Sequence, residues 1–162
     1  MVLSKYQKIK RCNFVLLLGN FQHSLDDKNR IRLPAKYREK LGSDYILMPG
    51  IGGCIFLYPA EAEEKFMKAV EGIGEFNTKS AETIRRIAEM SATVDADSQG
   101  RFMLPQELLS FARIDKDVRI VGAINRIEIW SEELYSKRRN ANDESSQAVD
   151  ELYMEFHQAM NK

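Results

Sequence analysis

Two short segments of the sequence place an aspartate four residues before an arginine, an arrangement that can present a cation to an anion. Asp26 precedes Arg30, Asp97 precedes Arg101, and Leu-Pro follows each arginine at the third and fourth positions. A guanidinium group offers a planar fork of N–H donors to a phosphate or to a guanine edge. The carboxylate can accept hydrogen bonds from the N–H groups of the turn or hold the guanidinium. We therefore interpret Asp26 and Asp97 as loop-organising residues and the two arginines as the groups that the loops present.

The neighbours of the two arginines differ in charge. Lys28 and Arg32 accompany Arg30, whereas Gln99 and Met103 stand at the matching positions of the second copy. We therefore expect the first loop to bind phosphate more strongly than the second. The alternative is that each Asp–Arg pair is an ion pair that only stabilises the fold, since structural ion pairs are common.

Both segments belong to a longer internal repeat in which matching arginines and matching prolines are separated by 71 residues. Each half reads as strand, turn, strand, short helix, strand, turn, strand and helix. The alternation of apolar and cationic residues over 30–33 is typical of a half-buried strand. Pro34 and Pro105, each followed by helix-forming residues, predict the start of a short helix. The repeat predicts an α+β fold in which two pseudo-symmetric halves pack on one another.

The chain resembles the MraZ family of bacterial transcriptional regulators, in the AbrB/SpoVT superfamily. The resemblance runs from about Leu17 to about Lys137. It is carried by Leu18–Phe21, Ser24–Lys28, Leu33–Arg38, Gly100–Arg101, Leu104–Pro105 and Ile127–Trp130. It implies tandem pseudo-symmetric AbrB-like β-hairpin units that form a swapped-hairpin β-barrel with flanking helices. The family has Gly before the motif arginine, where the first copy has Asn29. Asn tolerates a left-handed backbone, so we expect the turn to be kept.

The resemblance also implies a function, because the family contacts DNA through this motif. The expected DNA-binding residues are Lys28, Asn29, Arg30, Arg32, Gln99, Gly100 and Arg101. The implied protein is a sequence-specific DNA-binding regulator, expected to be a repressor of the division and cell-wall gene cluster. It would bind short promoter repeats in double-stranded DNA as a ring-like homo-oligomer, in the cytoplasm and associated with the nucleoid. The rival readings are an antitoxin-like AbrB relative with a toxin partner and an oligomeric scaffold without nucleic-acid binding.

The repeat and the charge distribution suggest how the chain is divided. We expect a basic N-terminal extension at 1–14, AbrB-like halves at 15–76 and 77–139, and a linker with a C-terminal helix at 140–162. Residues 1–40 hold ten Lys and Arg against three acids, net +7, whereas residues 140–162 hold one Lys against five acids, net −4. This asymmetry suggests a basic face for phosphates and an acidic tail held elsewhere. The alternative is solvated charge that has no partner.

The tail contains apolar residues at helical spacing: Val149, Leu152, Tyr153, Phe156 and Met160. They predict an amphipathic helix. It could pack on its own domain or on a neighbouring subunit, and periodicity does not separate these possibilities.

The remaining candidates for chemistry are weak. His23 could form a base or metal pair with Asp26 or Asp27, but metal sites need several converging ligands and the other histidine, His157, lies in the tail. The Gly-rich link 49–53 lacks the Gly-Lys-Ser/Thr ending of a phosphate loop and joins two predicted strands, so we interpret it as a hairpin connection. We expect no enzymatic activity, no cofactor and no metal site.

Three further features bear on the compartment. Cys12 and Cys54 lack the spacing of a zinc site or a disulfide framework, which fits a reducing cytoplasm. The apolar run 14–18 has five residues, too few for the core of a signal peptide. No stretch approaches the ~20 apolar residues of a membrane helix.

Overall fold

The computed structural model describes residues 15–73, 78–141 and 146–161. The expected N-terminal extension lies outside this part of the chain. In the first half, the elements are β1 (Asn20–Ser24), β2 (Arg30–Arg32), α1 (Ala35–Leu41), β3 (Asp44–Pro49), β4 (Ile55–Pro59), the 3₁₀ turn η1 (Ala60–Ala62) and α2 (Glu63–Ile73). In the second half, they are α3 (Thr78–Met90), β5 (Ala92–Asp95), β6 (Arg101–Met103), α4 (Gln106–Phe111), β7 (Asp117–Gly122), β8 (Ile127–Ser131), α5 (Glu132–Ala141) and α6 (Ser146–Met160).

The two halves are interleaved in one antiparallel sheet with the strand order β1-β7-β8-β4-β3-β5. Exchanging each strand for its repeat equivalent reverses this order and leaves the pairings unchanged. The first strand of each half therefore pairs with the third strand of the other half: β1 with β7, and β5 with β3. The α+β class and the pseudo-symmetric arrangement agree with the prediction. The described strands form an open sheet and a separate two-stranded sheet, so the predicted closed barrel is not confirmed.

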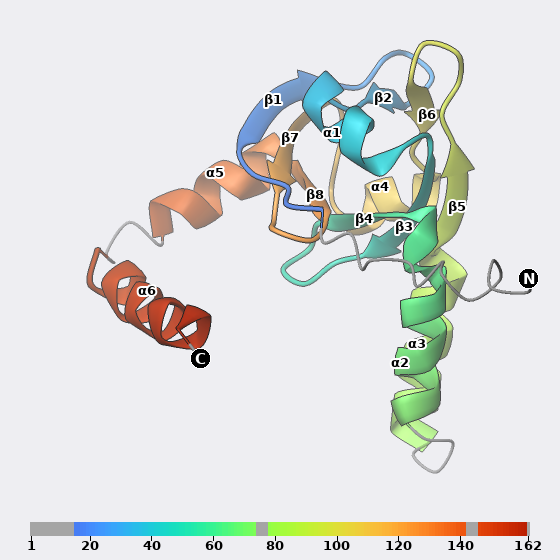
Figure 1. Ribbon diagram of the computed structural model, residues 1–162. Coiled ribbons are helices and arrows are strands. Elements are labelled where there is room, and N and C mark those ends of the chain that lie inside the picture. Colours follow the sequence, from blue (N-terminus) through green and yellow to red (C-terminus); the bar gives the residue numbers. More distant parts are fainter. Residues whose placement is uncertain (1–14, 74–77, 142–145, 162) are drawn as a thin grey trace, which may run out of the picture.

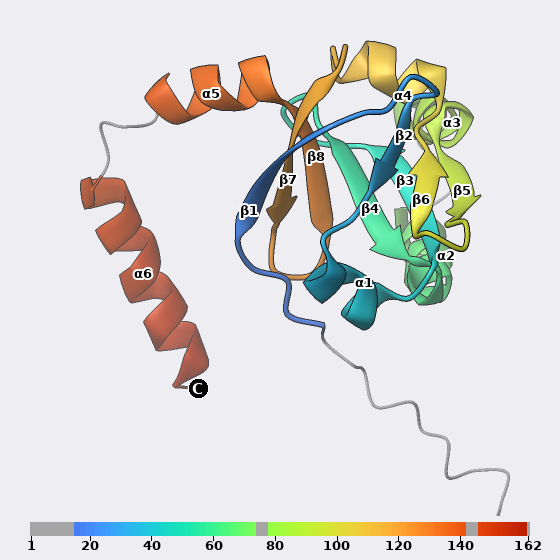
Figure 2. The same ribbon diagram turned by 90° about the horizontal axis from the view of Figure 1, so that it is seen from above.

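The second sheet is a ribbon made of β2 and β6, one strand from each half, which lie side by side in both views (Figures 1 and 2). Ile31 pairs with Phe102 at its centre. Because side chains alternate along a strand, this pair points inward while its neighbours point outward. Ile31 is 1% and Phe102 2% exposed. The sequence pattern predicted this alternation, and the ribbon adds a further pairing between the halves to those in the larger sheet.

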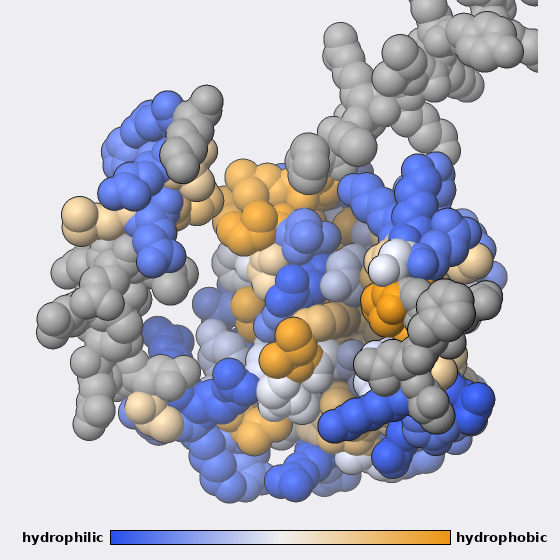
Figure 3. Space-filling view, turned by 90° about the horizontal axis from the view of Figure 1, so that it is seen from below, coloured by the Kyte–Doolittle hydropathy of each residue, from blue (hydrophilic) through white to orange (hydrophobic). Residues whose placement is uncertain are grey.

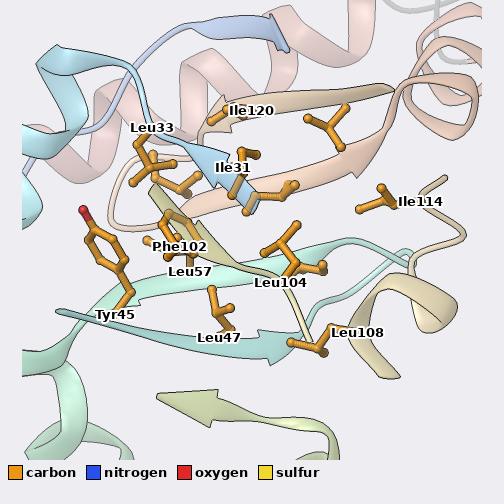
Figure 4. Close-up of a cluster of buried hydrophobic side chains, with 14 of the residues drawn as sticks. Ile31, Leu33, Tyr45, Leu47, Leu57, Phe102, Leu104, Leu108, Ile114 and Ile120 are labelled. Atoms are coloured by element: carbon orange, nitrogen blue, oxygen red, sulfur yellow. The ribbon is translucent and has the colours of Figure 1, made fainter. Parts of the chain in front are cut away.

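The hydrophobic core lies between the ribbon and the larger sheet, with α1 and α4 at its sides (Figure 4). Its fully buried large side chains come from both halves: Tyr37, Tyr45, Phe102, Leu17, Ile31, Leu33, Leu47, Ile55, Leu57, Leu104, Leu108 and Ile120. Burying one such side chain stabilises the fold by roughly 1.5–3 kcal/mol. Because neither half has a core of its own, we expect the halves to fold together.

The helices after each Leu-Pro begin where the sequence predicted. Pro34 and Pro105 stand at the N-caps of α1 and α4, where the missing N–H of proline costs no helical hydrogen bond. The Gly-rich link forms the β3–β4 hairpin connection, closed by the Gly50 N–H donating to the Cys54 carbonyl at 2.7 Å. Both predictions are confirmed.

The remaining helices project from this body (Figure 1). The α2–α3 pair extends as a stalk, and α6 stands apart from the sheet. The tail is helical as predicted, but Tyr153, Phe156 and Met160 are 65%, 58% and 65% exposed, so these side chains do not pack on the rest of their own chain. Among the described residues, no helix combines the length and the apolar character needed to cross a bilayer.

Candidate nucleic-acid interface

The first hairpin, residues 26–30, is closed by its aspartate. Oδ1 of Asp26 accepts the backbone N–H groups of Lys28 and Arg30, both at 2.9 Å, and Oδ2 accepts Nε of Arg30 at 2.7 Å. Asn29 has the left-handed φ of 56° that the turn requires. One carboxylate therefore fixes both the turn and the arginine that leaves it.

The second hairpin, residues 97–101, repeats this arrangement. Oδ1 of Asp97 accepts the N–H groups of Gln99 and Arg101 at 2.9 Å, and Oδ2 accepts Nε of Arg101 at 3.0 Å. Gly100, with φ of 77°, stands where the first hairpin has Asn29. The two turns have the same geometry despite the different residue at the left-handed position.

The same hydrogen bonds shift the titration of both carboxyls. The pKa of Asp26 is below its ordinary value, mainly because the carboxylate accepts the backbone N–H of Arg30. The pKa of Asp97 is lowered in the same way by the N–H of Arg101. Hydrogen bonds that favour the charged form lower the pKa of a carboxyl group. Both hairpins are therefore organised by ionised carboxylates at neutral pH.

The outer face of the ribbon carries four side chains: Arg30, Arg32, Arg101 and Met103. Arg30 lies opposite Met103, and Arg32 lies opposite Arg101. Arg30 and Arg101 use Nε for their aspartates, with side chains 26% and 34% exposed. Within the described part of the chain, their terminal nitrogens make no hydrogen bond. These nitrogens remain available to an anion above the ribbon.

The position of Arg32 differs from what the sequence suggested. It was expected to add charge to the first hairpin, but the antiparallel pairing places it beside Arg101, at the end of the ribbon that holds the second hairpin. The first hairpin keeps Lys28, whose side chain is exposed. Gln99 is also exposed at the tip of the second hairpin. The pairing therefore moves the Arg32 charge to the second hairpin, and the stronger phosphate binding expected of the first loop stays a prediction.

One cation near the ribbon was missed by sequence reasoning. A Cβ atom at Gly100 would lie 3.1 Å from Cδ and from Nη1 of Arg38, which places this α1 side chain against the second hairpin. The position of Arg38 in the repeat corresponds to Leu109, which is buried, so the repeat gave no signal for it. Only the packing of α1 against the other half's hairpin reveals the contact.

The other candidates are not brought together. His23 lies exposed on β1, and the remaining histidine, His157, lies on α6. Among the residues that the structure describes, no three His, Cys, Asp or Glu side chains form a group that could hold a metal ion. Cys54 is fully buried, and burial raises the pKa of its thiol to about 12. A thiol in this environment is not a nucleophile at neutral pH.

Comparison with known proteins agrees with this geometry. A family described as "MraZ protein, putative antitoxin-like" matches the chain twice, over residues 16–87 and 89–156. The protein named transcriptional regulator MraZ of Syntrophomonas wolfei is 39% identical over 131 residues, covering 81% of this chain and 91% of that protein. The proteins of the same name from Clostridium tetani and Desulforamulus reducens are 32% and 38% identical, covering 85% and 81% of this chain and 96% and 92% of their own lengths. The doubled hairpin and these matches together establish that the chain belongs to the MraZ family.

Proposed function

We propose that this chain is a sequence-specific DNA-binding transcriptional regulator that contacts duplex DNA through the ribbon and its two hairpins. The observation that carries the proposal is the outer face of the ribbon, where Arg30, Arg32 and Arg101 stand, two of them held through Nε by Asp26 and Asp97 with their terminal nitrogens available. Curated relatives are named transcriptional regulators. The proposed contact residues are Lys28, Asn29, Arg30, Arg32, Gln99, Gly100 and Arg101, with Asp26 and Asp97 as organisers of the hairpins. In this proposal each aspartate accepts from Nε of its arginine, and the terminal nitrogens of the arginine donate to phosphate or guanine.

A two-stranded ribbon can enter the major groove, which is about 12 Å wide. Its strands are only three residues long, however, so one copy offers little contact area. Specific protein–DNA interfaces bury on the order of 1,000–2,500 Å² of protein surface. Several linked copies on repeated sites would raise the affinity through effective concentration. We therefore propose that the active form is a ring-like homo-oligomer that binds short promoter repeats.

A hydrophobic surface supports self-association. Leu17 and Ile124 pair through two backbone hydrogen bonds, so Ile124, 58% exposed, lies opposite the segment in which Leu16 and Leu18 are 51% and 50% exposed. Figure 3 shows apolar patches interspersed with hydrophilic side chains on one face of the molecule. Ile124 also has a φ of 71°, which is costly for a β-branched residue. In the proposed oligomer, this surface is covered by a second copy.

The proposal also covers what the protein regulates and how its chain is divided. We propose that the protein represses the division and cell-wall gene cluster, acts in the cytoplasm and associates with the nucleoid. We also propose halves at 15–76 and 77–139 between an extension at 1–14 and a tail at 140–162. The rival functions are an antitoxin bound to a toxin, in line with the family description, and a scaffold that does not bind nucleic acid.

The test is a gel shift with the duplex upstream of the chain's own gene, titrated in parallel with a duplex of the same composition and scrambled sequence. A DNA-binding regulator shifts the first duplex at lower protein concentration. Salt weakens the complex because the protein's Lys and Arg side chains release counterions from the DNA when they bind. Equal affinity for both duplexes would contradict sequence-specific recognition. A scaffold would shift neither duplex, and an antitoxin would bring a stoichiometric toxin with it on purification.

A further inference from the structure

A shallow recess of about 320 Å³ lies beside the ribbon, between β1 and the start of α1. It is lined by Phe21, Gln22, His23, Arg32, Leu33, Pro34, Ala35 and Arg38. None of these lining residues is acidic, and three of them carry nitrogen donors with cationic or titratable character. A recess with this lining favours an anion.

The arginines of the recess also touch the second hairpin. A Cβ atom at Gly100 would lie 3.1 Å from Nη1 of Arg38 and 3.5 Å from Nε of Arg32. Arg101 lies opposite Arg32 in the ribbon. The side chains of Arg38 and Arg32 therefore approach each other at Gly100, and Asp97 holds the neighbouring Arg101 through Nε. Asp97 offsets the charge of Arg101, so Arg32 and Arg38 are the pair of like charges that an added anion would stabilise.

Hydrogen bonding orients one member of this cluster. Nε of Arg38 donates to the Leu33 carbonyl at 3.0 Å, which fixes the guanidinium beside the recess. Its terminal nitrogens have no acceptor among the described residues, and neither does the Arg32 side chain. An arginine with Nε engaged and both Nη groups available is suited to paired hydrogen bonds with phosphate oxygens.

The first hairpin has no matching cluster. The repeat places Met103 at the position of Arg32 and Leu109 at the position of Arg38. Met103 is exposed and Leu109 is buried, so neither supplies a cation. The recess is therefore a feature of one end of the ribbon and not a product of the pseudo-symmetry.

We propose that the recess binds a phosphate group through Arg38 and Arg32, with His23 and Gln22 at its rim, and that this group is a backbone phosphodiester of the bound DNA. This inference rests on the proposed function and adds Arg38 to the contact surface. A phosphate contact positions the duplex without reading its sequence. The second hairpin would then be held by one more phosphate than the first.

The test uses the full-length protein and compares Arg38→Gln with Arg85→Gln. Arg85 lies on α3, in the stalk and away from the ribbon in Figure 1, and donates to Glu82 at 2.8 Å, so its loss removes the same charge elsewhere. Affinity for the upstream duplex is measured by fluorescence anisotropy at several salt concentrations. For Arg38→Gln, the slope of log K against log salt should fall by about 0.9 for each bound subunit, and affinity should fall equally for specific and scrambled duplexes. The Arg85→Gln protein should keep the wild-type slope.

Two further variants keep the test decisive. Arg38→Lys retains the charge but not the fork, so it should keep the slope while binding more weakly. If Arg38→Gln does not fold, because its bond to Leu33 is lost, Arg32→Gln replaces it. A folded Arg38→Gln protein with the wild-type slope would overturn the inference.

A second arm separates the possible sources of phosphate. The imidazole resonances of His23 are followed by NMR while inorganic phosphate or a 5′-mononucleotide is added to wild type and Arg38→Gln. Saturation at micromolar nucleotide, with no change in the DNA salt slope, would assign the recess to a free nucleotide and overturn the phosphodiester assignment. If wild type binds no DNA, the proposed function fails. The phosphodiester assignment fails with it, and the NMR arm then reports whether the recess binds phosphate at all.

Discussion

Arg32 lies directly opposite Arg101 across the ribbon, so that arginines from different halves of the chain share one end of a two-stranded sheet. Like charges at directly opposed positions destabilise an antiparallel pair. Asp97 offsets the charge of Arg101, and an anion above this end would offset that of Arg32 as well, which is why we regard the ribbon as a binding surface and not only as a link between the halves. The two hairpins have equivalent sequences and turns, but the register of β2 and β6 places an arginine opposite Arg101 and a methionine opposite Arg30.

The different surroundings of the two hairpins predict different changes in the free energy of unfolding when the equivalent turn residues Gly100 and Asn29 are substituted. Gly100→Ala places a side chain on a left-handed backbone, which costs roughly 1–2 kcal/mol, and its Cβ would press on Arg38. Asn29→Gly keeps the left-handed turn, so the free energy of unfolding should change by less than about 0.5 kcal/mol. Urea denaturation at fixed protein concentration measures both. A Gly100→Ala protein as stable as wild type would contradict the strained geometry.

Acidification should loosen the hairpins in a defined direction. The pKa values of Asp26 and Asp97 are lowered in the fold, because both carboxylates accept backbone N–H groups. A group with a lowered folded pKa stabilises the fold above its unfolded pKa, and this contribution is lost as pH falls through the folded pKa. Stability from the hairpins should therefore be intact at neutral pH and lost only in strong acid.

Carboxyl ¹³C NMR resolves this titration. Both resonances should have midpoints below the ordinary aspartate value, and Asp26→Asn should reduce the acid dependence of stability. Midpoints at or above the ordinary value would show that the hydrogen bonds of the turns are not formed in solution.

The interleaved sheet predicts that the halves unfold together. Phe102→Ala removes a ring at the centre of the ribbon and should cost about 3–5 kcal/mol, whereas Ile31→Val, on the paired residue, should cost about 0.5–1.5 kcal/mol. Both variants should unfold in one transition by circular dichroism and by tryptophan fluorescence. Two separate transitions, one for each half, would be incompatible with strands exchanged between halves.

Local signals in the sequence predicted the elements well. Alternation over 30–33 and the prolines at 34 and 105 indicated strands and short helices, and the structure contains them. Ser131 precedes α5 with a side chain typical of a helix cap, and its Oγ accepts the N–H of Leu134 at 3.4 Å. Each of these signals depends on residues close together in the chain, which is why the sequence alone was sufficient.

The sequence alone did not determine which strands from distant parts of the chain pair with each other. The repeat implied two halves, but the partner of β2 had to be known before Arg32 could be assigned to a hairpin. Arg38 was missed for the same reason, because it touches Gly100 of the other half. The exposure of Tyr153 and Phe156 was also undetermined, since helical spacing shows that an apolar face exists and not what covers it.

Removal of the tail should leave the rest of the chain folded. The described apolar side chains of α6 are exposed, so deleting residues 141–162 removes little buried surface from the rest of the chain. We expect a melting temperature close to that of wild type and unchanged preference for the upstream duplex per subunit. A truncated protein that stays folded but binds specific and scrambled duplexes equally would place recognition in the tail.

The most direct test of the ribbon as the DNA contact is the affinity of Arg30→Ala and Arg101→Ala for the upstream duplex, compared with Arg85→Ala on the stalk. Removing either ribbon arginine should weaken binding by about 1–3 kcal/mol for each engaged subunit while the circular dichroism spectrum is unchanged. Arg85→Ala should bind as wild type does. Wild-type affinity in both folded ribbon variants would contradict the assignment of DNA binding to this surface.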